Sequence, residues 1–277
     1  MTSDLPSAAE LLELARSIAV EAGELIARRR SEGVTVAASK SSPEDVVTFA
    51  DRESEDFIRA RLASARSDDG FFGEESAATP GRSGITWVVD PIDGTVNYLY
   101  GIPAYAVSIA AVQGDPDPSA WTTLAGCVVN PVLGEVFTAS RGGGAQLNGR
   151  ELAVNTGVAL DQALVGTGFS YSAELRVKQG QFLTGLVGRV RDIRRAGSAA
   201  LDLCSVAAGR LDAYAERGLN PWDHAAGALI AREAGARVGG FGDAAEGLVM
   251  TLAGDPVLLE TLEPLLFELH RDAGLPL

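Results

Sequence analysis

The sequence has few of the residues that bind soft metals or form nucleophilic triads. Its 277 residues include two histidines, His224 and His270, and two cysteines, Cys127 and Cys204. So few histidines argue against a histidine-based zinc site and against a Ser-His-Asp hydrolase. The cysteines lie in apolar runs without a C-x-x-C pair, which predicts two buried thiols in a reducing compartment. We expect His270 to be a solvated residue near the end of the last helix.

Basic residues are scarce relative to acidic ones. The chain has 23 Lys and Arg against 37 Asp and Glu, its net charge is −14, and its longest basic run is Arg28-Arg29-Arg30. Neither nucleic acid nor an anionic membrane surface is therefore expected as the main partner. The N-terminus lacks a basic segment followed by an apolar core, and no uncharged apolar run is long enough to span a membrane. These absences predict a cytoplasmic protein.

The rest of the composition is that of a folded globular protein. Apolar residues make up 46% of the chain, which is long enough for one large domain or for two subdomains with a shared core. A capping-box sequence at Ser7 predicts a long first helix that ends near Gly33. Strands with short connections follow, and from Ala163 onwards strands alternate with helices. We expect a layered α+β or α/β sandwich, divided into residues 1–155 (α+β) and 156–277 (α/β).

One stretch, Trp87 to Tyr98 (W-V-V-D-P-I-D-G-T-V-N-Y), predicts a strand, a turn and a helix in close succession. Ile85 to Val89 has the β-branched and aromatic composition of a buried strand. Because Pro91 has no N–H group to give a sheet, we expect the strand to end at Asp90-Pro91. Asp93-Gly94 then turns the chain, and Thr95 is expected to cap a short helix that runs on to Tyr100.

The same stretch gathers oxygen ligands beside a helix start. Asp90 and Asp93 flank the Ile92 carbonyl, and the N–H groups of Gly94 and Thr95 lie where a helix dipole favours an anion. Hard oxygen ligands next to an anion-binding helix start suit a Mg²⁺–phosphate site. An ordinary capped turn with two solvated aspartates explains these residues equally well when they are taken alone.

Four other acidic residues each have a simple structural explanation. Asp51 ends the segment that begins at Lys40, and it lies near the start of a second helix, where the dipole favours an aspartate. Glu74, in G-E-E-S, is explained as an exposed strand end. Glu216 ends the apolar strand that begins at Leu211, and Asp223 lies at the start of a further helix.

The order of these segments resembles the inositol monophosphatase family. Asp51 after V-V-T, Glu74 in G-E-E-S, the stretch from Asp90 to Thr95, and Asp223 in W-D-H-A-A-G match the family motifs one by one. The likeness runs from Lys40 to about Gly240, and the segment that ends at Glu216 in Y-A-E is similar to bacterial members. The resemblance implies a layered αβαβα sandwich of the sugar-phosphatase type, a homodimer, and Mg²⁺-dependent, Li⁺-sensitive hydrolysis of small phosphate monoesters.

The resemblance also implies a metal-ligand set. One metal would be held by Glu74, Asp90 and the Ile92 carbonyl, and a second by Asp90, Asp93 and Asp223. A weaker third metal would use Glu74 through water, so about two to three Mg²⁺ ions are implied for each site.

Catalytic and substrate-binding roles follow from the same match. Asp51 and Thr95 would orient and help to deprotonate the attacking water, with Glu74 as the third catalytic residue. The N–H groups of Gly94 and Thr95 would hold the phosphate. The implied substrate-contacting residues are Asp93, Gly94, Thr95, Gly197, Ser198, Ala199, Glu216 and Asp223.

Several functions share these motifs. Inositol-1-phosphate is the expected substrate, because the A-G-S-A-A and Y-A-E segments favour the inositol group. Fructose-1,6-bisphosphatase, 3′,5′-bisphosphonucleotide phosphatase and histidinol phosphatase remain as alternatives. Arg176 and Lys178 are either close enough to reach a second phosphate or part of a solvated helix face. A binding partner of the transcription machinery is the alternative from another class, although the intact ligand set favours retained catalysis.

Overall fold

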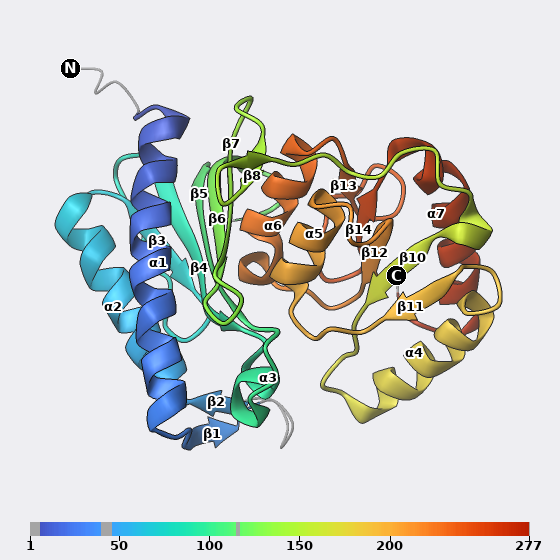
Figure 1. The fold of residues 1–277 in the computed structure, drawn as a ribbon, viewed down its shortest axis with the longest axis horizontal. Helices are drawn as coiled ribbons and strands as arrows, with labels where there is room; N and C mark the ends of the chain where they lie inside the picture. The colour runs from blue at the N-terminus through green and yellow to red at the C-terminus, as the bar shows by residue number, and fades with distance from the viewer. Residues whose placement is uncertain (1–5, 40–45, 115–116, 277) are drawn as a thin grey trace.

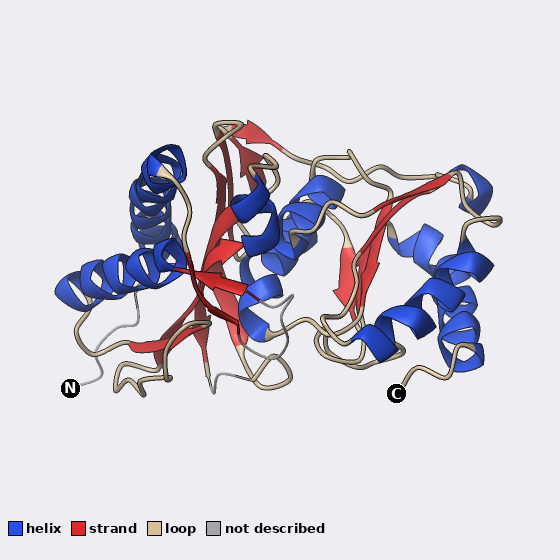
Figure 2. Ribbon diagram, turned by 90° about the horizontal axis from the view of Figure 1, so that it is seen from below, coloured by secondary structure: helices blue, strands red, loops and turns tan. Residues whose placement is uncertain are grey.

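The computed structural model describes residues 6–39, 46–114 and 117–276, so part of the segment that begins at Lys40 lies outside the described residues. The chain forms five alternating layers of helices and sheets (Figure 1). Viewed from below, the layers alternate helix, strand, helix, strand, helix across the molecule (Figure 2). The expected αβαβα sandwich is therefore confirmed.

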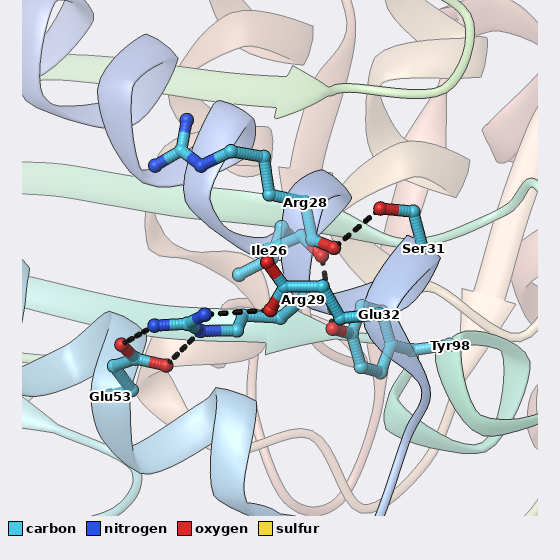
Figure 3. Close-up of polar contacts among 7 residues, drawn as sticks. All are labelled: Ile26, Arg28, Arg29, Ser31, Glu32, Glu53 and Tyr98. Carbon is cyan, nitrogen blue, oxygen red and sulfur yellow. Dashed lines mark hydrogen bonds and ion pairs between the residues drawn. The ribbon is translucent and has the colours of Figure 1, made fainter.

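The first layer consists of α1 (Ala8–Glu32) and α2 (Phe49–Ala65). The capping box at Ser7 is present, because its side chain accepts from the Glu10 N–H while the Glu10 carboxylate accepts from the Ser7 N–H. Arg29 on α1 forms an ion pair with Glu53 on α2, at 2.6 Å (Figure 3). This ion pair joins the two helices, and a small sheet of β1 (Val36–Ser39) and β2 (Val46–Thr48) lies beside them.

The second layer is a seven-stranded sheet in the order β3-β4-β5-β6-β7-β8-β9. Neighbouring strands are antiparallel except for the parallel pair β3–β4. The strands are β3 (Gly70–Gly73), β4 (Ile85–Asp93), β5 (Ala106–Gln113), β6 (Thr122–Asn130), β7 (Glu135–Ser140), β8 (Ala145–Leu147) and β9 (Arg150–Glu151).

Strand β4 does not end where the sequence predicts. It continues through Pro91 to Asp93, with a register shift against β5 between Asp90 and Asp93. An irregularity of this kind leaves a residue unpaired, so it tolerates the missing N–H of Pro91. The prediction for Thr95 also needs correction, because Gly94 holds the N-cap position of α3 (Thr95–Tyr100) with φ +95° and Thr95 is the first helical residue.

The third layer consists of the central helices α5 (Ala199–Ala207) and α6 (Pro221–Glu233). Beyond them lies a five-stranded sheet in the order β11-β10-β12-β14-β13. Helices α4 (Ala173–Leu186) and α7 (Pro256–Asp272) cover its far side, and a short 3₁₀ turn, η1 (Leu160–Gln162), precedes it (Figure 1). The strands are β10 (Leu164–Thr167), β11 (Asp192–Arg194), β12 (Ala213–Glu216), β13 (Arg237–Gly239) and β14 (Thr251–Gly254).

Apolar clusters fill the spaces between successive layers. Trp87 and Ile109 belong to the cluster under α1 and α2, whereas Val88 and Ala110 belong to the cluster under α5 and α6. Consecutive residues of the same strand thus enter different cores, as the alternation of a strand buried on both faces requires. Two further clusters lie on the two faces of the second sheet.

The central helices pack on both sheets. Leu229 of α6 lies in the cluster of the seven-stranded sheet, and Ala231 lies in that of the five-stranded sheet. The expected boundary between residues 155 and 156 falls in the connection from β9 to η1. The central helix layer comes from the second part of the chain but completes the core of the first.

Two predictions about single residues have opposite outcomes. Cys127 and Cys204 are both buried free thiols, as expected. His270 is fully buried, so its prediction as a solvated residue was wrong. The chain beyond α7 folds back over it, and the Pro276 carbonyl lies 2.9 Å from its Nε2 atom. Within the described part of the chain, no helix combines the length and apolar character needed to cross a membrane.

Candidate active site

The acidic residues singled out in the sequence lie where strand ends meet helix starts. Glu74 follows β3, and Asp90 and Asp93 lie in the last part of β4. Asp51 and Asp223 occupy the first turns of α2 and α6. The N-terminal end of a helix carries partial positive charge, which lowers the cost of placing carboxylates there.

Asp51 and Thr95 form the pair that the sequence comparison implies. The Thr95 hydroxyl lies 3.0 Å from Asp51 Oδ1 and 3.1 Å from the Ile92 carbonyl oxygen. The second oxygen of Asp51 accepts from the N–H and hydroxyl groups of Thr48, the N-cap residue of α2. Asp51 is therefore held from one side by its own helix cap and contacts α3 from the other. Burial raises the pKa of Asp51 to about 6.

Asp93 connects the end of β4 to the start of α5. Its Oδ2 atom accepts from the Ser198 hydroxyl at 2.6 Å and from the Ala200 N–H at 2.7 Å. Burial raises the pKa of Asp93 to about 6, against the effect of these hydrogen bonds. Ser198 is also the N-cap of α5. The structure thus brings the expected substrate-contacting segment directly against the expected metal ligand.

Asp90, Asp223 and Glu74 act on one another electrostatically. Burial raises the pKa of Asp90 well above its usual value, and the negative charges of Glu74, Asp93 and Asp223 raise it further. Burial and the charges of Glu74 and Asp93 do the same to the pKa of Asp223. For both carboxyl groups the charged neighbours named here are acidic, so these carboxyl groups repel one another.

The chemistry of this group fits a hard divalent cation. Its donors are carboxylate oxygens and, at Ile92, a backbone carbonyl, which are the ligands that Mg²⁺ prefers. A bound cation would also remove the mutual repulsion that raises the pKa values of Asp90 and Asp223. Among the described residues, no three His, Cys, Asp or Glu side chains already surround one point as a finished metal shell. Asp93, for example, is turned towards Ser198 and Ala200.

Glu216 lies at the end of β12, as predicted, but it is more enclosed than a residue that projects freely from a strand end. Burial raises the pKa of Glu216 to about 7, while the hydroxyl of Tyr214 donates to its Oε2 atom. Gly168 leaves the room that this carboxylate occupies, because an added Cβ there would lie 2.0 Å from Glu216 Oε1. Glu216 is therefore held between Gly168 and the Tyr214 hydroxyl.

Gly197 is held in place by Asn97 of α3. The Asn97 amide donates to the Ala104 carbonyl at 2.7 Å and to the Ala196 carbonyl at 2.9 Å. Gly94 lies in the same contact, where an added Cβ would be 2.8 Å from the Ala104 carbonyl oxygen and 3.1 Å from that of Gly197. The turn after β4 and the segment before α5 are thus packed backbone to backbone.

The two basic residues with an open role lie on α4. Lys178 forms an ion pair with Glu174 one turn earlier, at 3.3 Å. Arg176 contacts the carbonyls of Ser170 and Tyr171, at 3.4 and 3.3 Å. These contacts favour the interpretation of Arg176 and Lys178 as part of a helix face rather than as ligands of a second phosphate.

Several supporting residues were missed by the sequence analysis. Thr48 could have been predicted, because T-F-A-D from Thr48 to Asp51 is a capping pattern. Tyr214 could also have been predicted as a neighbour of Glu216, because it lies two residues earlier on the same strand and so on the same face. Asn97 and Asp202 carry no local signal. Asp202 on α5 is buried with an unpaired Oδ2 atom, and burial and the charges of Glu216 and Asp93 raise its pKa.

Comparison with known proteins adds an independent result. Residues 7–270 match the inositol monophosphatase family. Over 249 residues the chain is 49% identical to the inositol-1-monophosphatase of Mycobacterium bovis, with 83% of each chain covered. It is also 42% identical over 238 residues to the Nus factor SuhB of Pseudomonas aeruginosa, covering 83% of this chain and 85% of that protein. The solved structure of Mycobacterium tuberculosis SuhB is similar, with a TM-score of 0.79, 43% identity, and coverage of 95% of this chain and 98% of that one.

Proposed function

Because the chain belongs to the inositol monophosphatase family, whose members are phosphatases, we propose that it hydrolyses a small polyol phosphate monoester with Mg²⁺ as cofactor. Inositol-1-phosphate is the first candidate substrate, since a relative with 49% identity is named for that activity. The observation that carries the proposal is the buried acidic group in which Glu74, Asp93 and Asp223 raise the pKa of Asp90. Such a group gains most from binding a divalent cation.

The chain's own residues supply the remaining parts of the reaction. Glu74, Asp90, Asp93, Asp223 and the Ile92 carbonyl would hold the metal ions, which when bound supply positive charge to the phosphoryl oxygens and acidity to bound water. The Thr95 hydroxyl, which donates to Asp51, orients a water molecule. As this hydroxyl accepts a proton from the water, it passes its own proton to the Asp51 carboxylate. The N–H groups of Gly94 and Thr95 receive the phosphate at the start of α3.

A phosphate-release panel tests the activity. The purified protein would be assayed with and without Mg²⁺ on inositol-1-phosphate, fructose-1,6-bisphosphate, 3′,5′-bisphosphoadenosine and histidinol phosphate. We expect Mg²⁺-dependent release that is fastest with inositol-1-phosphate. A lack of release from all four substrates would contradict the phosphatase proposal, and faster release from a bisphosphate would contradict the substrate. Inhibition by Li⁺ at millimolar order is expected in the same assay, as for a weak cation site.

Glu216 is the residue on which the choice of a polyol monophosphate depends. Its carboxylate accepts hydrogen bonds from hydroxyl groups, as it does from Tyr214, and in its charged form it repels a second phosphate. Losing one charged hydrogen bond costs about 1.5–3 kcal/mol in kcat/KM. We therefore expect Glu216→Gln to weaken hydrolysis of inositol-1-phosphate more than that of glycerol-2-phosphate. Equal losses on the two substrates would show that Glu216 does not recognise the hydroxyl groups of the polyol.

Binding to the transcription machinery is a second candidate function. It is favoured by one observation, the 42% identity to a protein named as a Nus factor. A pull-down with the bacterial transcription apparatus, using the active protein and the inactive Asp93→Asn variant, would separate this role from catalysis. A binding role predicts that both proteins capture the apparatus equally.

A homodimer is also proposed, and an exposed apolar surface supports it. Tyr100 and Ile102 are 75% and 47% exposed, and Val132 and Leu133 are 48% and 58% exposed. The Asn130 side chain joins the segment after α3 to the turn after β6. It donates to the Pro103 carbonyl and accepts from the N–H groups of Val132 and Leu133. Exposed apolar side chains gathered on neighbouring loops are typical of interfaces. Light scattering across a concentration series would give the mass in solution, and a monomer throughout would contradict the dimer.

A further inference from the structure

Helix α2 contacts the site at more places than Asp51 alone. Asp51 and Glu55 lie four residues apart, so they share one face of the helix. Between them, the Ser54 hydroxyl donates to the Pro91 carbonyl at 3.3 Å, within the irregular part of β4. One buried helix face thus touches both the water-orienting pair and the segment that carries Asp90 and Asp93.

Glu55 reaches a third segment, loop 74–79, which begins with Glu74. Its Oε2 atom accepts from the Glu75 N–H at 2.8 Å, and its Oε1 atom accepts from the Ser76 hydroxyl. The side chain is only 2% exposed. It lies close against the end of β3, because an added Cβ at Gly73 would be 2.3 Å from Glu55 Oε2.

Arg59, one turn further along α2, holds the rest of loop 74–79. Its guanidinium lies 4.0 Å from the centre of the Phe71 ring and donates to the Ser76 hydroxyl, the Ala77 carbonyl and the Thr79 hydroxyl. Thr79 in turn pairs with Phe71 through two backbone hydrogen bonds. The Glu74 N–H itself donates to the Val89 carbonyl of β4 at 3.2 Å. The loop is therefore attached on both sides of Glu74.

We propose that Glu55 is a positioning residue that sets the location of Glu74 relative to Asp90, and that Glu55 and Arg59 together form a clamp on loop 74–79. A loop that begins with an acidic residue next to Asp90 is repelled by the carboxylates already there. Two hydrogen bonds to the charged Glu55 acceptor oppose that repulsion, since such bonds are stronger than neutral ones. The clamp therefore keeps Glu74 in place before a cation arrives. This inference rests on the proposed role of Glu74 as a metal ligand.

Substitutions at Glu55 test the clamp. Glu55→Ala removes both acceptors, whereas Glu55→Gln keeps one acceptor oxygen. Loss of a residue that orients a metal ligand lowers metal affinity by about 10- to 100-fold. We expect the Mg²⁺ concentration for half-maximal activity to rise by that factor in Glu55→Ala and by less in Glu55→Gln, while kcat at saturating Mg²⁺ recovers towards the parent value.

The matched control is Glu53→Gln. Glu53 lies on the same helix, but its carboxylate pairs with Arg29 of α1 (Figure 3), whereas that of Glu55 accepts from loop 74–79. We expect no change in the Mg²⁺ requirement of this variant. If Glu55→Ala fails to fold, Ser76→Ala replaces it, because Ser76 is exposed and its loss removes two contacts of the clamp, one to Glu55 and one to Arg59.

A second readout does not depend on activity. Hydrogen exchange of the metal-free protein would report the Glu75 N–H, which should lose protection in Glu55→Ala and keep it in Glu53→Gln. Mg²⁺ binding measured by calorimetry should weaken in parallel with the kinetic requirement. A lower melting temperature and a lower kcat with an unchanged Mg²⁺ requirement would overturn the proposal and leave Glu55 as a structural residue.

The variant Glu74→Gln separates this inference from the proposed function. If it leaves the Mg²⁺ requirement unchanged, Glu74 is not a ligand and the proposed metal site fails. If Glu74→Gln raises the requirement and neither Glu55→Ala nor Ser76→Ala does, the clamp alone fails.

Discussion

At the scale of single residues, Asp93 combines a structural and a chemical role. Asn at this position keeps an oxygen that accepts from Ser198 and Ala200 but lacks the charge that a cation needs. We expect Asp93→Asn to fold, with a metal-free melting temperature that is not lowered because one repelling charge is gone, and to lose roughly 100-fold or more in kcat. Circular dichroism melting and phosphate release measure the two effects.

The control for Asp93→Asn is Asp192→Asn. Asp192 is an exposed carboxylate paired with Arg194 on β11, so the same chemical change there should leave activity unaltered. Substantial Mg²⁺-dependent turnover by folded Asp93→Asn would contradict the metal-ligand set.

Thr95 tests the water-orienting pair. Its single hydroxyl proton is within reach of Asp51 Oδ1 and the Ile92 carbonyl, so its lone pairs remain available to an attacking water. We expect Thr95→Ala to lower kcat by roughly 100-fold, as for the loss of a proton-transfer group, with little change in Mg²⁺ binding. Thr95→Ser keeps the hydroxyl and should retain most of kcat. An unaltered kcat in Thr95→Ala would mean that the hydroxyl only ties α3 to α2.

At the scale of secondary-structure elements, the turn from β4 into α3 depends on Gly94. Its φ of +95° is costly for other residues, and an added Cβ would lie 2.8 Å from the Ala104 carbonyl oxygen. We expect Gly94→Ala to lower the free energy of unfolding by roughly 1–3 kcal/mol and to reduce kcat/KM. Gly134→Ala is the control, because Gly134 also has a positive φ but has no neighbour within 4 Å of an added Cβ. Urea unfolding should show a larger loss at Gly94.

Elements with local signals were predicted well from the sequence. The Ser7 capping box and Gly33 placed α1. The errors arose where tertiary contacts override a local rule. Pro91 does not stop β4, because the irregular pairing with β5 needs no N–H from it.

The site shows the same division between local and long-range information. Its acidic residues were identified from motif order, which depends on resemblance rather than on spacing. The buried contacts that hold them were not predicted, because Ser198 reaches Asp93 across more than a hundred residues of sequence. Asn97 and Glu55 likewise act on backbone groups that only the folded chain brings close.

At the scale of the whole molecule, the acidic site makes stability depend on pH. Burial raises the pKa of Glu216 to about 7, and burial together with neighbouring carboxylates raises those of Asp90 and Asp223 well above their usual values. Between about pH 6.5 and 8.5 the folded metal-free protein therefore binds more protons than the unfolded chain, so its stability falls as pH rises. The buried His224, whose pKa burial lowers to about 4, has the opposite effect, which fades as pH rises above the ordinary histidine pKa of about 6.5.

Melting temperatures measured in a chelator across this pH range should therefore decrease. Saturating Mg²⁺ should reduce the slope, because a cation stabilises the charged carboxylates in place of protons. Asp93→Asn should also flatten the metal-free profile. A melting temperature that rises or stays level from pH 6.5 to 8.5 without metal would contradict the raised pKa values.

The shared central layer has a consequence for how the chain is made. A ribosome adds roughly 5–20 residues per second, and the seven-stranded sheet is complete before α5 and α6 emerge. During that interval the face that includes Val88, Ala110 and Phe137, later covered by those helices, is open to water. A nascent chain halted near residue 155 would thus expose an apolar sheet face that is prone to aggregation. The exposed face of the sheet should therefore need chaperone protection until α6 has emerged from the ribosome.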